Sequence, residues 1–303
     1  MRLVSVILPT YNRKKYLQEA VGSVLQQSYA ELEVIVIDGG SDDGTREWLR
    51  SREDDRLKLI THDQPRGPGI ARNVGLGASS GEYIVFLDDD DRLLENAIGT
   101  LVETIRGQPQ DCGGVYTAYR TVDESGNQCE SRISDGKVTR FSDACINGPS
   151  CTLIRKTVVE QIGTFDESFQ AREDADFWIR LFLEFHMIAL DKVLYERRIH
   201  VDQLSEDNEL MLRAQKQLIA KHWDHLSDRE LAHRLSLVAL NQAQSGQTGQ
   251  ARRNLRKARS IHKLDRHSLY YYFWLHLGSI GYKIGHFGAN RILKPVLDIS
   301  THK

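Results

Sequence analysis

Four short runs rich in Val, Ile and Leu within the first ninety residues constrain the fold of this chain most strongly. They are Leu3–Leu8, Leu32–Ile37, Leu57–Thr61 and Tyr83–Leu87. Each run is apolar on both faces, as a parallel strand must be when helices cover both sides of its sheet. Two segments with helical character, Lys14–Gln27 and Ile70–Ser79, lie between the runs. This alternation predicts an α/β fold, with a doubly wound and mostly parallel sheet flanked by helices.

The remainder of the chain changes character near residue 205. Before that point we expect a helix over Leu93–Arg106, strands at Gly113–Tyr119 and Cys151–Arg155, and a buried helix over Ala175–Phe185. After it, the pattern is helical only, with amphipathic segments at Glu209–His222, Asp228–Gln244 and Gln250–Ile261. The sequence therefore predicts an α/β domain over residues 1–205 and an all-helical C-terminal extension over residues 206–303.

Composition excludes several classes of protein. The net charge of −2 and the pI of about 6.6 give no global electrostatic basis for nucleic-acid binding. The four cysteines form no C-x-x-C pair and show no zinc-finger spacing. The apolar N-terminal run is too short for a signal peptide, and no apolar run approaches the roughly twenty residues that span a bilayer. We therefore expect a cytoplasmic protein.

The C-terminal tail differs from this average. From Ala251 to Lys303 it carries eleven Lys and Arg residues against two Asp and no Glu. Within it, Leu269–Leu277 is densely aromatic and has basic residues on both sides. Such a segment suits peripheral binding to the anionic inner face of the cell membrane. A helix that packs on the first domain or on a dimer partner is an equally good interpretation.

Polar clusters follow three of the predicted strands. Pro9–Arg13 follows the first strand, Asp38–Thr45 the second, and Asp88–Asp91 the strand at Tyr83–Leu87. The carboxyl ends of parallel strands lie along one edge of an open sheet, where ligands bind. We therefore expect these three clusters, far apart in the sequence, to converge in space.

The run Asp88–Asp91 needs positive charge nearby, because four consecutive carboxylates repel one another. A divalent cation with oxygen ligands, Mg²⁺ or Mn²⁺, meets this need and commonly binds substrate phosphates as well. The alternative is a solvated acidic turn whose carboxylates interact with the dipole of the helix that follows.

Four segments in order resemble the family 2 glycosyltransferases of the GT-A fold. They are VSVILPTYNR, EVIVIDGGSDDGT, ARNVGLGASSGEYIVFLDDDD and FDESFQAREDADFWIRL, and the resemblance runs from Val4 to Ser205, roughly two thirds of the chain. It implies an inverting, metal-dependent enzyme that transfers a sugar from a nucleotide-diphosphate donor, a UDP- or dTDP-sugar, to a hydroxyl group. The implied acceptor is a glycan or a lipid-linked molecule in cell-surface polysaccharide or glycan biosynthesis.

The resemblance assigns the nucleobase to the first two strand ends. Pro9, Thr10 and Tyr11 would hold the base, and the Tyr11 ring offers a stacking face. Asp38 would contact the base or the ribose. Many family members have a second Asp directly after this position, whereas this chain has Gly39, so the identity of the base stays open.

The resemblance assigns the metal and diphosphate to the acidic run. Asp90 would bind the metal, and Asp88 or Asp89 would bind the ribose or the metal, with the register uncertain by one residue. His200 matches a position that completes the metal shell or contacts the diphosphate in many members. Arg72 would contact a phosphate or a sugar hydroxyl at the donor site. The resemblance thus implies a metal site of Asp88, Asp90 and His200, with Asp88 and Asp89 also in the donor site.

The remaining implied residues lie at the acceptor or at the border of the donor site. Asp174, the second acid of the pair Glu173-Asp174, matches the general base that accepts the proton of the attacking hydroxyl. Glu173 and Asn73 border the donor site. The alternative for the acidic pair is capping of the helix that begins there. Trp178, one turn further on, is expected in the core.

Three rival functions remain for comparison. A nucleotidyltransferase would open with a glycine-rich phosphate loop, and an NAD-dependent enzyme with G-x-G-x-x-G, but the first strand here ends in Pro-Thr-Tyr-Asn. A non-catalytic nucleotide-sugar-binding protein would lack the metal acid or the base, whereas Asp90 and Asp174 are both present.

Overall fold

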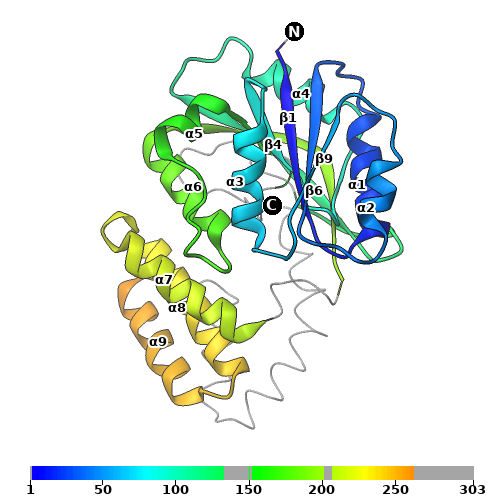
Figure 1. Cartoon of the computed structure of the whole chain (residues 1–303). Coiled ribbons are helices and arrows are strands. Elements are labelled where there is room, and N and C mark those ends of the chain that lie inside the picture. Colours follow the sequence, from blue (N-terminus) through cyan, green and yellow to red (C-terminus); the bar gives the residue numbers. More distant parts are fainter. Residues whose placement is uncertain (1, 133–149, 151, 201–206, 263–303) are drawn as a thin grey trace. The chain divides into compact units, whose positions relative to one another are not determined.

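The computed structural model describes residues 2–132, 150, 152–200 and 207–262 (Figure 1). The chain divides into two compact units, Met1–Gln203 and Leu204–Lys303. The aromatic segment Leu269–Leu277, Cys145 and Cys151 lie outside the described residues, so the membrane prediction for the tail stays a prediction.

The first unit is built on one twisted sheet with nine strands among the described residues. Its strands are β1 (Val4–Thr10), β2 (Leu32–Asp38), β3 (Leu57–Thr61), β4 (Tyr83–Phe86), β5 (Arg92–Leu93), β6 (Cys112–Val122), β7 (Gln128–Arg132), β8 (Thr152–Arg155) and β9 (His186–Arg198). Their order across the sheet is β3-β2-β1-β4-β8-β6-β9-β5, and β7 pairs with β6.

The sheet is mixed, so the prediction of a doubly wound parallel sheet holds for one half only. Strands β1 to β4 are parallel to one another. Strand β8 is antiparallel to both β4 and β6, whereas β9 is parallel to β6. An apolar run shows that a strand is covered on both faces but carries no information on its direction, which is why the sequence missed this reversal.

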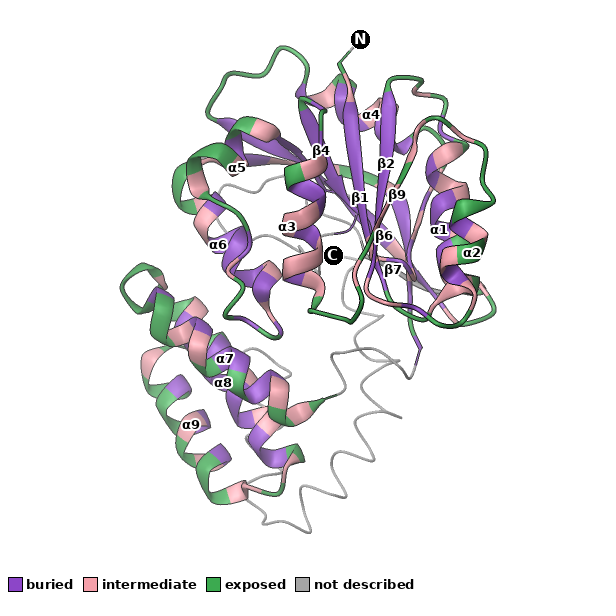
Figure 2. Ribbon diagram, viewed as in Figure 1, coloured by how far each residue is buried: buried purple, intermediate pink, exposed green. Residues whose placement is uncertain are grey.

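Helices cover both faces of the sheet. They are α1 (Lys14–Leu25), α2 (Thr45–Arg50), α3 (Pro68–Ala78), α4 (Ala97–Ile105), α5 (Lys156–Ile162) and α6 (Glu173–Glu184). Helices α1, α2 and α4 contribute to one apolar cluster, and α3, α5 and α6 contribute to the other. Strand β1 supplies both, because Val6 and Leu8 point to the first cluster and Ile7 to the second. Figure 2 shows strands β1, β2 and β4, between these layers, as almost wholly buried.

Several elements depart from the sequence prediction. The helix expected from Leu93 begins only at Ala97, because Leu93 belongs to β5. Helices α2 and α5 and the long strand β9 were not predicted. In β9 the pair Asp191-Lys192 interrupts the apolar pattern, so periodicity alone gives no strand there. The prediction that Trp178 lies in the core is confirmed, since 1% of this residue is exposed.

The second unit contains three long helices among its described residues, α7 (Asn208–His222), α8 (Asp228–Gln244) and α9 (Thr248–Ile261). Ser227 and Glu230 form a capping box at the start of α8. Small and apolar side chains, among them Ala239 and Leu255, pack α8 against α9. In the described part of the chain, no helix combines the length and the apolar character that crossing a membrane requires.

A close contact fixes helix α3 against the sheet. A Cβ atom added at Gly75 would lie 2.4 Å from Ile7 Cγ2 and 2.9 Å from Ile37 Cδ1. The same atom at Gly77, two residues along the helix, would meet nothing within 4 Å. The absence of a side chain at residue 75 therefore lets α3 approach the sheet, and this approach sets the position of the residues at the start of the helix.

We predict opposite effects for one substitution at these two glycines. Gly75→Ala forces α3 away from β1 and lowers the free energy of unfolding by about 1–3 kcal/mol. Gly77→Ala, the matched control, raises it by up to about 1 kcal/mol through helix propensity. Urea unfolding of both variants measures the difference. Equal stability of the two would contradict the close packing of α3.

Candidate functional site

The three polar strand ends converge as the sequence predicts. Thr10, at the end of β1, donates a hydrogen bond from Oγ1 to Asp89 Oδ2 at 2.7 Å. Asn12 joins the same strand end to the loop after β2, because its backbone N–H donates to Ser41 Oγ and its side-chain oxygen accepts from the N–H of Asp42. Residues more than seventy positions apart in the sequence thus form one edge.

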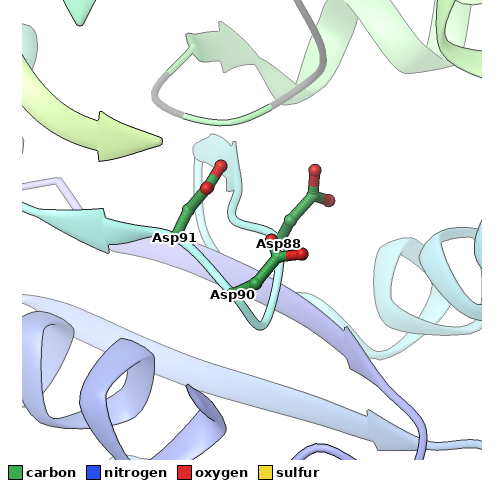
Figure 3. Close-up of side chains that lie close together, drawn as sticks. All are labelled: Asp88, Asp90 and Asp91. Atoms are coloured by element: carbon green, nitrogen blue, oxygen red, sulfur yellow. The ribbon is translucent and has the colours of Figure 1, made fainter. Parts of the chain in front are cut away.

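The acidic turn Asp88–Asp91 lies between β4 and β5 at this edge. Carboxylate oxygens of Asp88, Asp90 and Asp91 lie within 4.8 Å of one another (Figure 3). A group of carboxylate oxygens at this spacing suits a hard divalent cation such as Mg²⁺ or Mn²⁺. Asp91 is the member of the group that the sequence interpretation did not assign, although the unbroken run of four acids contained it.

Burial makes the ionised forms of Asp89 and Asp91 less favourable. Desolvation and the charge of Asp90 raise the pKa of Asp89 to about 7, against the lowering effects of Arg13 and Thr10. Desolvation and the charges of Asp90 and Asp88 also raise the pKa of Asp91 well above its ordinary value. The ionised forms of these carboxylates are therefore unfavourable without further positive charge, and a bound cation would supply it.

Two side chains converge on Asp90. Arg13 NH1 lies 2.9 Å from Asp90 Oδ2 and 3.1 Å from Asp89 Oδ1. His200 Nε2 lies 2.9 Å from the same Asp90 Oδ2, and its ring stacks on Tyr16 with 5.3 Å between the centroids. The structure therefore places His200 beside Asp90, while its role as a metal ligand stays a prediction.

Arg198, at the end of β9, supports the turn from the side opposite to solvent and was not predicted. Its backbone N–H donates to Asp91 Oδ1 at 3.1 Å, and its Nε donates to the carbonyl oxygen of Asp90 at 3.2 Å. Its NH2 pairs with Glu19 of α1 at 2.6 Å. Because 2% of Arg198 is exposed, these contacts fix the turn to the core. Arg198 lies two residues before His200, but nothing in the sequence indicated its contacts.

Arg72 links the acidic turn to helix α6. Its guanidinium pairs with Asp88 at 2.7 Å and with Glu173 at 2.6 Å, and 4% of its side chain is exposed. Burial acts to lower the pKa of Arg72, but the charges of Asp88, Glu173 and Asp174 outweigh it and raise the pKa. Desolvation likewise raises the pKa of Glu173 in spite of Arg72. Asp88 and Glu173, both predicted at the donor site, are thus joined through the guanidinium of Arg72.

Asp174 lies at the start of α6 and is partly exposed. Its Oδ1 accepts a hydrogen bond from the N–H of Ala175 at 2.7 Å, which leaves Oδ2 for another partner. Arg172, directly before the acidic pair, has a left-handed backbone with φ of 63°. Such a conformation is costly for a residue with a side chain and is often found at functional sites.

Asp38 and Asn73 are occupied within the protein. The fully buried carboxylate of Asp38 accepts from Arg46 Nε at 2.5 Å and from the backbone N–H groups of Gly40 and Ser41. The amide of Asn73 exchanges two hydrogen bonds of 2.9 Å with the backbone of Phe165. Both side chains hold loops at the edge of the site, and their predicted contacts with a donor stay predictions.

Residues 5–163, just over half of the chain, match the model of glycosyl transferase family 2. The chain belongs to this family. It is 29% identical over 209 residues to a Bacillus subtilis protein named as the teichuronic acid biosynthesis glycosyltransferase TuaG, covering 68% of this chain and 82% of the relative. It is 31% identical over 195 residues to the Campylobacter jejuni GalNAc(5)-diNAcBac-PP-undecaprenol beta-1,3-glucosyltransferase. That match covers 61% of each protein, so the matched part of the present chain spans about three fifths of that relative's length.

Solved structures show the same fold. Staphylococcus aureus TarS 1-349 in complex with UDP matches with a TM-score of 0.64 at 21% identity, over 95% of this chain and 91% of that 1-349 chain. The mannosyltransferase PcManGT of Pyrobaculum calidifontis, in complex with GDP-Man and Mn²⁺, matches with a TM-score of 0.60 at 18% identity, over 97% and 88% of the two chains. The GT-A fold that the sequence motifs implied is therefore confirmed.

We predict that Arg72 and Glu173 are energetically coupled. Arg72→Met leaves the buried Glu173 carboxylate without its cation and lowers the free energy of unfolding by about 3–5 kcal/mol. Glu173→Gln costs less, about 1–3 kcal/mol, because the amide oxygen still accepts from Arg72. The double variant is expected to be more stable than the sum of the two losses predicts. Additive losses in urea unfolding would show that the buried pair is not coupled.

Proposed function

We propose that this glycosyltransferase transfers a sugar from a UDP- or dTDP-sugar to a hydroxyl group by an inverting single displacement that requires Mn²⁺ or Mg²⁺. The observation that carries this proposal is the link between the acidic turn and helix α6. Asp88 and Glu173 share the guanidinium of Arg72 at 2.7 and 2.6 Å. A cation-binding turn and a carboxylate pair that could activate an acceptor are therefore held at one site.

The donor end of the site lies at the first strand ends. Tyr11 is 45% exposed, so its ring is free of the core and can stack on a nucleobase. Pro9 and Thr10 would border the base, with Asp38 and Asn73 fixing the adjacent loops. Asp89, fixed by Thr10 and Arg13, would face the ribose. The arrangement supports a nucleoside diphosphate whose phosphates extend toward Asp88 and Asp90.

The metal would be held by Asp88, Asp90 and Asp91, with His200 close enough to Asp90 to complete the shell. When bound, it would stabilise the negative charge that develops on the departing diphosphate. Arg198 and Arg72 keep the acidic turn in place during this charge change, because both are buried and held by several partners. The protein thus supplies a preorganised site rather than a mobile one.

Asp174 would act as the general base. It would accept the proton of the acceptor hydroxyl as that oxygen attacks the anomeric carbon, and the bond to the diphosphate oxygen would break on the opposite face of the sugar. One displacement inverts the anomeric configuration, and a covalent enzyme intermediate is not needed. Glu173, paired with Arg72, would hold the start of α6 and so the position of Asp174.

The acceptor is proposed to be a glycan or a lipid-linked molecule in cell-surface polysaccharide biosynthesis. The name of one relative specifies a glycan on undecaprenyl diphosphate, and that of the other specifies teichuronic acid. Peripheral membrane binding through the basic aromatic tail would bring the enzyme to such an acceptor. Equal flotation on anionic vesicles by the full chain and by residues 1–261 would contradict this tail assignment.

We predict metal-dependent hydrolysis of one donor class. Purified protein is incubated with UDP-, dTDP- and GDP-sugars, with and without Mn²⁺ or Mg²⁺, and release of nucleoside diphosphate is measured. Release is expected with a uridine or thymidine donor and metal, and Asp90→Asn is expected to reduce it by at least about 100-fold.

The exposed Asp55→Asn is the matched control, because it removes a carboxylate before β3, at the amino end of the parallel strands, whereas the acidic turn follows the carboxyl end of β4. A binding protein without catalytic activity would bind a nucleotide sugar and release no nucleoside diphosphate. Activity of Asp90→Asn equal to that of Asp55→Asn would rule out the acidic turn as the metal site.

Asp174→Asn separates donor binding from acceptor activation. Calorimetry is expected to give a donor affinity within about threefold of the wild type, because Asp174 would not contact the nucleotide. Transfer to an acceptor found by screening glycans and lipid-linked glycans is expected to fall by about 10²–10⁴-fold. Unchanged transfer by Asp174→Asn would exclude this residue as the base.

A further inference from the structure

Arg13 differs from the other arginines that contact the acidic turn. It lies in the loop between β1 and α1, directly before α1, and 27% of its side chain is exposed. Arg72 and Arg198 are 4% and 2% exposed and bind partners on other elements. Arg13 pairs with two members of the turn, Asp89 and Asp90. Its side chain is the most exposed of the three arginines.

The contact of Arg13 with Asp90 competes with metal binding. Asp90 Oδ2 receives Arg13 NH1 and His200 Nε2, both at 2.9 Å. One carboxylate oxygen has two lone pairs, so a metal ion can take this atom only if one of the two contacts is given up. Neutral imidazole can itself become a ligand of the metal, whereas a guanidinium cannot, because it stays protonated and repels a cation. Arg13 is therefore the group that must move.

A displaced Arg13 has a suitable partner within the proposed reaction. A donor diphosphate would lie against the metal, and its oxygens accept two parallel N–H bonds from a guanidinium. Arg13 extends from the loop that also carries Tyr11, the proposed contact of the nucleobase. The nucleobase of the donor and its metal-bound phosphates would thus lie on either side of Arg13.

We propose that Arg13 is an exchangeable counter-cation, which neutralises Asp89 and Asp90 before the metal binds and contacts the donor diphosphate afterwards. This inference rests on the proposed function. In this role Arg13 lowers the affinity for the metal alone. It raises the affinity for the nucleotide when the metal is present. Metal and donor would accordingly bind with positive cooperativity, because each makes the other's site available.

The test measures the two binding steps separately in Arg13→Gln. Mn²⁺ alone is titrated into the full chain, with free Mn²⁺ followed by electron paramagnetic resonance. Binding is expected to be about fivefold tighter than in the wild type, because one competing ion pair is gone. UDP, dTDP and GDP are then titrated at saturating Mn²⁺. The best nucleotide is expected to bind about tenfold more weakly, because one charge-assisted contact is lost.

Two variants serve as controls. Lys15→Gln removes the same charge from an exposed position two residues away and is expected to change neither affinity by more than about twofold. Arg13→Lys keeps the charge and is expected to restore at least half of the lost nucleotide affinity on a logarithmic scale. Circular dichroism melts establish that each variant is folded.

Opposite shifts of the two affinities are the diagnostic result, since a structural role would weaken both. Weaker or unchanged Mn²⁺ binding in Arg13→Gln, or unchanged nucleotide binding, would overturn the inference on Arg13. Failure of the wild type to bind Mn²⁺ and every nucleotide would instead overturn the proposed function.

Discussion

The first unit is organised around a concentration of negative charge at the carboxyl ends of its central strands. Four aspartates follow the buried strand β4, and two of them, Asp89 and Asp91, are themselves buried. Carboxylates in such a place need positive charge close by, or their ionised forms become too unfavourable. Arg13, Arg72 and Arg198 provide it from three different parts of the chain. Their contacts bring α1, α3 and β9 to the same turn.

Each arginine has a distinct consequence. Arg198 fixes the backbone of the turn, because it donates to the carbonyl of Asp90 and to the carboxylate of Asp91. Arg72 fixes the turn relative to α6, because it binds both Asp88 and Glu173. Arg13 pairs with the side chains of Asp89 and Asp90. Two buried arginines thus fix the turn to the core, and the third is the one that we propose to be exchanged for a metal.

The sequence predicted the strands that carry the site and the convergence of their ends, because both follow from apolar runs and from the geometry of parallel sheets. The resemblance to the family placed His200 and Asp90 in one group. The sequence missed the antiparallel direction of β8, the long strand β9 and the contacts of Arg198. These depend on strand direction and on contacts such as that between residues 198 and 90, which no local pattern encodes. The sequence also contained no indication that Asp38 binds Arg46 or that Asn73 binds the backbone of Phe165.

A crystal of the full chain soaked with Mn²⁺ and the nucleoside diphosphate that it binds tests the central claim most directly. The account predicts one strong anomalous peak within about 2.0–2.6 Å of carboxylate oxygens of the acidic turn, Asp90 among them, and of a phosphate oxygen. A nucleotide bound elsewhere, or a peak remote from Asp88, Asp90 and Asp91, would contradict the account and leave the acidic turn as a purely structural element.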